Sequence, residues 1–125
     1  MINIDIKSNK PIYEQIITEI KQNVIRGYLK AGDELPSVRK LALELSVTPN
    51  TVSKAYQELE RTKVIETIRG KGTYIAENME NKVEDIEKME KIKKEISIQI
   101  LELIYMGYDK NRIKEIIDDI YDSLK

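Results

Sequence analysis

The 125-residue sequence contains no cysteine, histidine, tryptophan or phenylalanine. Without cysteine and histidine it can form no disulfide, no zinc site built from those ligands and no imidazole-based catalytic site. We therefore expect no cofactor and no metal site. Small secreted domains usually carry disulfides, so the absence of cysteine favours the reducing cytoplasm as the compartment of this protein.

Long apolar runs are also missing. No run approaches the roughly 18 residues of a membrane span, and the first ten residues, MINIDIKSNK, lack the apolar stretch of a signal peptide. Apolar residues make up 41% and charged residues 34%, with only five glycines and three prolines, which is typical of a helix-rich soluble protein. The length fits one domain, or one small domain with an appendage, and we expect no membrane partner.

The net charge of −1 argues against a uniformly basic nucleic-acid-binding protein, but the charge is unevenly distributed. Residues 37–75 hold seven basic and four acidic side chains, whereas residues 76–125 hold nine basic and thirteen acidic ones. The middle of the chain is therefore the candidate surface for a nucleic acid.

Three helices are predicted in the first half of the chain. Residues 11–27 have isoleucine and valine at helical spacing, and residues 28–36 read as a loop punctuated by glycine and proline. Ser37 is a plausible N-cap of a short second helix, and Thr48 of a third, with Pro49 in its first turn. A helix, a tight turn and a helix at this spacing predict a helix-turn-helix.

A β-hairpin is predicted after the third helix. The β-prone segments 64–65 and 73–75 flank the sequence RGKG, residues 69–72, which reads as a turn with a basic tip. Alone, this turn could be an ordinary solvated loop. Directly after a helix-turn-helix, it indicates the wing of a winged helix.

The third helix, over residues 48–62, has two unlike faces. Val52, Ala55, Tyr56 and Leu59 cluster on one side and must face the core. The opposite side carries amides, a hydroxyl and basic groups that suit hydrogen bonding to base edges and phosphates, although it could also be a solvated polar face. Its members are Asn50, Ser53, Lys54, Gln57 and Arg61.

The tail predicts two more helices, one from about residue 79 that ends at Gly107 and one that follows it. Their apolar surface exceeds what two helices can bury against each other, which favours self-association. The alternative is that the pair folds back over the winged helix, while its many acidic residues disfavour a membrane surface. The candidate dimerisation residues are Ile98, Leu101, Ile104, Tyr105, Ile113, Ile116, Ile117, Ile120, Tyr121 and Leu124.

The segment LPSVRKLALELSVTPNTVSKAYQELERTKVIETIRGKGTYI resembles the DNA-binding domain of GntR-type bacterial transcription regulators. The preceding KPIYEQI and GYLKAGDELPS match as well, so the resemblance covers about residues 8–76. The short two-helix tail is similar to that of the YtrA-type subfamily, which lacks a large effector-binding domain. One departure is Lys63, which stands where the family commonly has a helix-ending glycine and must adopt or avoid the left-handed conformation.

The resemblance implies a winged helix-turn-helix at residues 1–77 that binds double-stranded DNA, and a helical dimerisation tail at residues 78–125. Independently of the resemblance, the polar face of the third helix makes Gln57 a candidate DNA contact, and the basic tip of the hairpin makes Lys71 another. The DNA contacts that the resemblance implies, carried over by position, are Ser37, Arg39, Thr48, Asn50, Thr51, Ser53, Lys54, Arg69 and Gly70.

We therefore expect a mostly α-helical protein with a small hairpin that acts as a homodimeric, sequence-specific repressor on an inverted-repeat operator. The alternative is a winged-helix protein-interaction module without sequence-specific DNA binding. An enzyme is not expected, because the acidic residues fall on helix exteriors with no convergent spacing. The sequence specifies no small-molecule effector.

Overall fold

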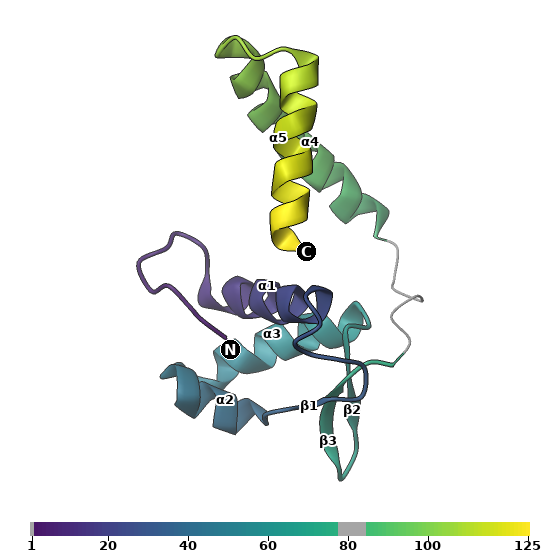
Figure 1. Ribbon diagram of the computed structural model, residues 1–125. Helices are drawn as coiled ribbons and strands as arrows, with labels where there is room; N and C mark the ends of the chain where they lie inside the picture. The colour runs from purple at the N-terminus through teal and green to yellow at the C-terminus, as the bar shows by residue number, and fades with distance from the viewer. Residues whose placement is uncertain (1, 78–84) are drawn as a thin grey trace. The chain divides into compact units, whose positions relative to one another are not determined.

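A computed structural model describes residues 2–77 and 85–125 of the chain (Figure 1). The described residues fall into two compact units, one on each side of residues 78–84. The expected domain boundary between residues 77 and 78 adjoins that segment and stays a prediction. The elements are α1 (Ile12–Ile25), β1 (Glu34–Leu35), α2 (Val38–Leu45), α3 (Pro49–Arg61), β2 (Ile65–Ile68), β3 (Gly72–Ile75), α4 (Ile86–Tyr105) and α5 (Lys110–Leu124).

The first unit is a three-helix cluster with a small sheet. Both α1 and α2 pack against α3, and α1 lies alongside α3 (Figure 1). Isoleucine, leucine and valine from every element of this unit meet in one core that begins at Ile16 and ends at Ile75. The predicted winged helix-turn-helix is confirmed.

The sheet is antiparallel, with strand order β1-β3-β2. The predicted hairpin is confirmed as β2 and β3, in which Ile65 pairs with Ile75 and Ile68 with Gly72. The third strand, β1, lies within a segment that we expected to be a loop. It has only two residues, too few to show an alternating pattern, and it exists because Glu34 and Leu35 pair with Tyr74 and Thr73.

The predicted helix starts are confirmed by their hydrogen bonds. The Ser37 hydroxyl accepts from the Lys40 backbone N–H at 3.1 Å, and the Thr48 hydroxyl accepts from the Thr51 N–H at 3.4 Å. Pro49 is the first residue of α3, where its missing N–H leaves no helical bond unmade. The tight turn between α2 and α3 is made by Ser46, which has a left-handed backbone with φ of 57°.

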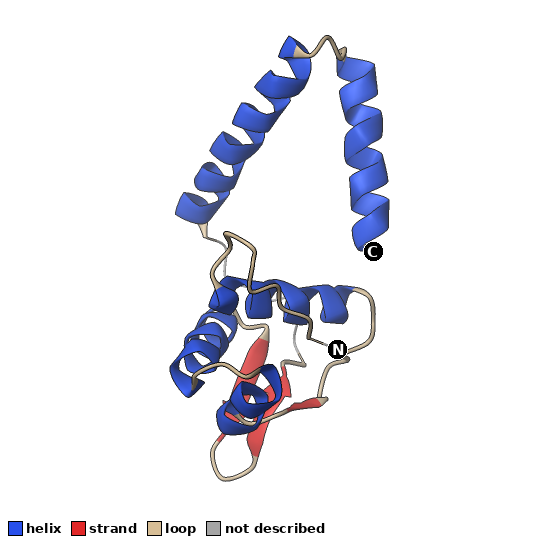
Figure 2. Cartoon of the chain, turned by 90° about the vertical axis from the view of Figure 1, so that its left-hand side faces the viewer, coloured by secondary structure: helices blue, strands red, loops and turns tan. Residues whose placement is uncertain are grey.

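The second unit consists of α4 and α5, which meet at the turn containing Gly107 and diverge from it (Figure 2). Asp85 and Asp109 cap the two helices by accepting from the N–H groups of Lys88 and Arg112. The start expected near residue 79 lies outside the described residues, which place the first turn of α4 at Ile86. In the part of the chain that the structure describes, no helix combines the length and apolar character needed to span a membrane.

Candidate nucleic-acid interface

The surface of α3 divides as its sequence predicts. Val52, Ala55, Tyr56 and Leu59 are buried. On the opposite side Asn50, Lys54 and Gln57 are exposed, and Ser53 is half-buried. The helix therefore presents a row of amide, hydroxyl and ammonium groups, and its apolar face anchors that row to the core.

The register of the sheet brings the start of α2 toward the wing. Since β1 is antiparallel to β3, with Glu34 opposite Tyr74 and Leu35 opposite Thr73, the chain leaves β1 in the direction of the tip at residues 69–71. Ser37 follows two residues later as the N-cap of α2. Two predicted basic groups, that of Arg39 and that of the wing tip, thus lie toward the same end of the sheet.

The wing tip has a backbone that requires glycine. The Lys71 N–H donates to the Ile68 carbonyl at 2.9 Å, which closes the turn, and Gly70 within it has φ of 81°. Gly72 has φ of 135°, and a Cβ there would lie 3.3 Å from Glu34 Oε2. The Tyr74 hydroxyl donates to the Lys71 carbonyl at 3.2 Å and braces the turn from the strand.

Tyr56 connects α3 to the turn before α2, a role that our sequence reasoning missed. Its hydroxyl donates to the Pro36 carbonyl at 2.7 Å. Burial, with a smaller effect of the Glu44 carboxylate, raises the pKa of the Tyr56 phenol well above its ordinary value, so the donor keeps its proton. The signal was a tyrosine at a core position, since a buried phenol needs a hydrogen-bond partner.

Some polar side chains of α3 already bond one another. The Thr48 and Thr51 hydroxyls are 2.9 Å apart, and the Gln57 amide donates weakly to the Ser53 hydroxyl at 3.5 Å. By contrast, four of the side chains predicted to contact DNA make no hydrogen bond, ion pair or ring contact of their own within residues 2–77 and 85–125. They are Arg39, Asn50, Arg69 and Lys71.

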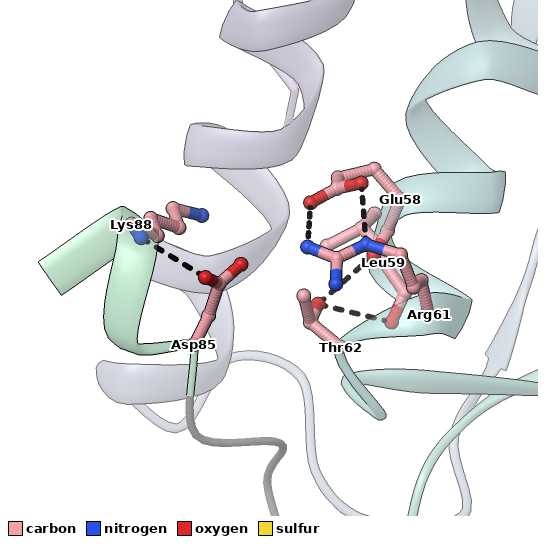
Figure 3. Close-up of polar contacts among 6 residues, drawn as sticks. All are labelled: Glu58, Leu59, Arg61, Thr62, Asp85 and Lys88. Atoms are coloured by element: carbon pink, nitrogen blue, oxygen red, sulfur yellow. Dashed lines mark hydrogen bonds and ion pairs between the residues drawn. The ribbon is translucent and has the colours of Figure 1, made fainter. Parts of the chain in front are cut away.

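Arg61, at the end of the polar face, is held by its own helix. Its guanidinium donates to both carboxylate oxygens of Glu58, at 2.7 and 3.0 Å (Figure 3). The Thr62 hydroxyl donates to the Glu58 carbonyl at 2.9 Å beside this pair (Figure 3). The next residue, Lys63, has φ of 61° and thus adopts the left-handed conformation in which glycine is favoured.

The predicted dimerisation residues of the second unit are mostly exposed. Leu101 is 65% exposed and Tyr105 is 89% exposed on α4, and Tyr121 is 59% exposed on α5. Ile113 differs, because it is buried near the turn, and Ile116 is half-buried. Ile113 therefore belongs to the packing of this chain, while the exposed members form an apolar surface.

The sequence profile described as bacterial regulatory proteins of the gntR family matches residues 12–75. The chain is 46% identical over its full length to the transcriptional repressor YtrA of Bacillus subtilis, of which it covers 95%. It is similar to a crystal structure titled transcriptional antiterminator from Listeria monocytogenes, with a TM-score of 0.84, 42% identity, and 99% and 92% of the two chains covered. It is also similar to YtrA from Sulfolobus acidocaldarius, a GntR-family transcription factor, with a TM-score of 0.55, 32% identity, and 98% and 97% covered.

Proposed function

Because the chain belongs to the GntR family of bacterial regulatory proteins and is of the YtrA type, it is a DNA-binding transcription regulator, and we propose that it acts as a homodimeric repressor on an inverted-repeat operator. The observation that carries this proposal is the polar face of α3, anchored by a buried apolar face and flanked by α2 and the wing. That arrangement suits a helix that enters the major groove.

Sequence reading is assigned to the exposed amides of α3. Asn50 has no side-chain partner among the described residues, so its amide is free to bond a base edge such as that of adenine. Gln57 donates only weakly to Ser53, and both can turn to a base when DNA replaces water. These side chains would carry the discrimination between one operator and another.

The groups around α3 are assigned to phosphate contacts that hold the protein in position on the DNA. The exposed guanidinium of Arg39 and the N-terminal hydroxyls of Ser37 and Thr48 suit phosphate contacts. Helix N-termini favour an anion there as well, because their backbone N–H groups point outward. In the wing, Arg69 and Lys71 reach the backbone or minor groove while Gly70 lets the turn approach closely.

Dimerisation is assigned to the exposed apolar surface of α4 and α5. A single winged helix reads only a few base pairs, which is too few to address a genome, so a second copy is needed to raise specificity. Side chains such as Leu101, Ile104 and Tyr105 are each more than half exposed in one copy. A second copy would cover them, and closed homodimers usually have two-fold symmetry, which predicts an inverted repeat.

Repression is proposed because the full-length relative YtrA of Bacillus subtilis is named a transcriptional repressor. A bound dimer would exclude other proteins from the DNA that it covers. We place the protein in the cytoplasm, where bacterial DNA is found and where a chain without cysteine needs no oxidising environment.

Selection of bound DNA from a random pool tests the proposal. The recovered sequences should share an inverted repeat with half-sites about one helical turn apart. The chain should bind this site at least about 10³-fold more tightly than scrambled DNA of the same length. No enriched sequence, together with no binding to any DNA in low salt, would instead support the protein-interaction module.

A further inference from the structure

A lysine of α3 is held by an aromatic ring of α1. The Lys54 Nζ lies 4.0 Å from the centroid of the Tyr13 ring. A cation within about 6 Å of a tyrosine ring centroid is attracted by the negative face of the ring. Tyr13 is the second residue of α1, so this contact joins the start of α1 to the middle of α3.

The Tyr13 ring is held in place by the core, whereas the Lys54 ammonium remains able to bind a further group. Tyr13 is half-buried and packs against the hydrophobic core, and its hydroxyl lies 3.4 Å from Glu14 Oε1. Lys54 is exposed and makes no ion pair within the described residues. Glu58, one turn further along α3, has both carboxylate oxygens on Arg61. The ring therefore orients Lys54 without occupying its N–H donors as a carboxylate would.

The position of the Tyr13–Lys54 pair determines which part of the DNA Lys54 can contact. The major groove of B-DNA is about 12 Å wide, and a helix with its side chains is about 10–12 Å across. The groove thus admits α3 but has no room for α1 beside it, although the two helices pack side by side (Figure 1). Lys54 belongs to the exposed row of α3, but its ammonium is held over a ring of the first turn of α1. With α3 in the groove, a cation held there would face the phosphate backbone that borders the groove.

We propose that Tyr13 is a positioning residue of the DNA interface, which holds the Lys54 ammonium at the boundary of α1 and α3 so that it contacts a phosphate rather than a base. This inference rests on the proposed function, in which α3 enters the major groove. It assigns Lys54 to affinity rather than to sequence reading. It also extends the DNA-contacting surface onto the first turn of α1.

A double-mutant cycle with Tyr13→Leu, Lys54→Ala and the pair tests the coupling. Lys54→Ala should weaken binding to the selected site and to random DNA alike, and reduce the slope of log K against log salt by about one unit. Tyr13→Leu should weaken both by about two- to five-fold, and this effect should vanish in the Lys54→Ala background. Tyr13→Phe should bind like the original chain, because a benzene ring keeps the face that holds the ammonium.

Tyr28→Leu is the matched control. Tyr28 follows the C-terminal end of α1, is 67% exposed, and makes no cation–ring contact among the described residues. Its replacement should leave DNA binding unchanged. Thermal unfolding of every variant separates a loss of affinity from a loss of folded protein.

A readout in the free, unmutated protein remains even where Tyr13→Leu fails to fold. The ring current of Tyr13 should shift the Lys54 ε-methylene protons upfield in the NMR spectrum. Random-coil shifts for these protons would overturn the proposal. So would a Tyr13→Leu effect that is equally large with and without Lys54, or a Tyr13→Phe effect as large as that of Tyr13→Leu. If the original chain binds no DNA, the proposed function fails, whereas additive losses in a chain that binds DNA overturn this inference alone.

Discussion

Asn50 offers the sharpest test of base reading by a single residue. Its side chain is exposed in the first turn of α3 and has no side-chain partner among the described residues. Asn50→Ala should cost about 1–3 kcal/mol of binding free energy on the selected site and little on random DNA, because only the selected site offers the matching base edge. Titrations of both DNAs by fluorescence anisotropy measure the difference.

Asn111→Ala is a matched control for this experiment. Asn111 is exposed and occupies the second position of α5, just as Asn50 occupies the second position of α3. It should have no effect on either DNA. Equal losses on the selected and random DNA after Asn50→Ala would assign Asn50 to the phosphate backbone instead.

Lys63 is a residue at which the backbone conformation conflicts with the side chain. Its φ of 61° lies in the left-handed region, which costs an L-residue about 1–2 kcal/mol, while glycine loses about 0.5–1 kcal/mol of chain entropy. Lys63→Gly should therefore raise the free energy of unfolding of the winged helix by about 0.5–1 kcal/mol, measured with urea. Lys63→Ala keeps the strained conformation and should not give that gain, and equal stability of the two variants would argue against strain at this position.

The contribution of the wing to DNA affinity is measured best by the salt dependence of DNA binding. Arg69 and Lys71 are exposed at its tip. If each contacts a phosphate, replacing either by Ala releases one counterion fewer on binding and makes the slope of log K against log salt shallower by about one unit. Arg39→Ala in α2 should have the same effect.

Lys91→Ala provides the control for these charge changes. Lys91 is an exposed lysine of α4, outside the winged helix. Its removal changes the net charge as Lys71→Ala does and should leave the slope unchanged. Unaltered slopes for Arg39, Arg69 and Lys71 would remove both α2 and the wing from the interface.

The elements were largely predictable because their signals are local. Caps at Ser37 and Thr48, the proline at the start of α3 and the glycines of the wing each act within a few residues. The two-residue β1 could not be predicted, since its existence depends on pairing with β3, about 40 residues further along the chain.

The candidate site likewise combines features set by nearby residues, which could be predicted, with contacts between distant residues, which could not. The polar face of α3 follows from helical periodicity, and the structure places its residues as that periodicity requires. The contacts of Tyr56 with Pro36 and of Tyr13 with Lys54 join residues that are 20 and 41 positions apart. Tyrosine at each position signals a polar or cationic partner, but only the packed structure identifies which one.

At the scale of the whole molecule, the two units should have separable tasks. The residues of the winged-helix core all lie between Ile16 and Ile75, so residues 1–77 should fold alone. The protein truncated to residues 1–77 should stay monomeric, because the exposed apolar surface of α4 and α5 is gone. It should bind the inverted repeat more weakly than the full chain by orders of magnitude. Sedimentation velocity measures the oligomeric state, and DNA titration measures the affinity. Non-specific DNA binding per monomer should be unchanged.

A substitution in the full chain gives the same test without truncation. Leu101 is 65% exposed, so Leu101→Glu should leave one copy folded but bury a charge in the proposed dimer interface. We expect a monomer with weakened operator binding. The exchange Lys91→Glu, on an exposed side chain about a quarter-turn around the same helix from Leu101, should stay dimeric. A Leu101→Glu dimer of unchanged affinity would show that this part of α4 lies outside the interface.

The central claim is that two copies related by a two-fold axis read two half-sites. It is tested most directly by binding of the full chain to the selected inverted repeat and to the same DNA with one half-site reversed. Both DNAs contain identical half-sites at the same centre-to-centre spacing, so only their relative orientation differs. The account predicts that reversal weakens binding by at least about 100-fold, since one reading helix then meets mismatched bases at about 1–3 kcal/mol each. Equal affinity for the two DNAs would contradict it.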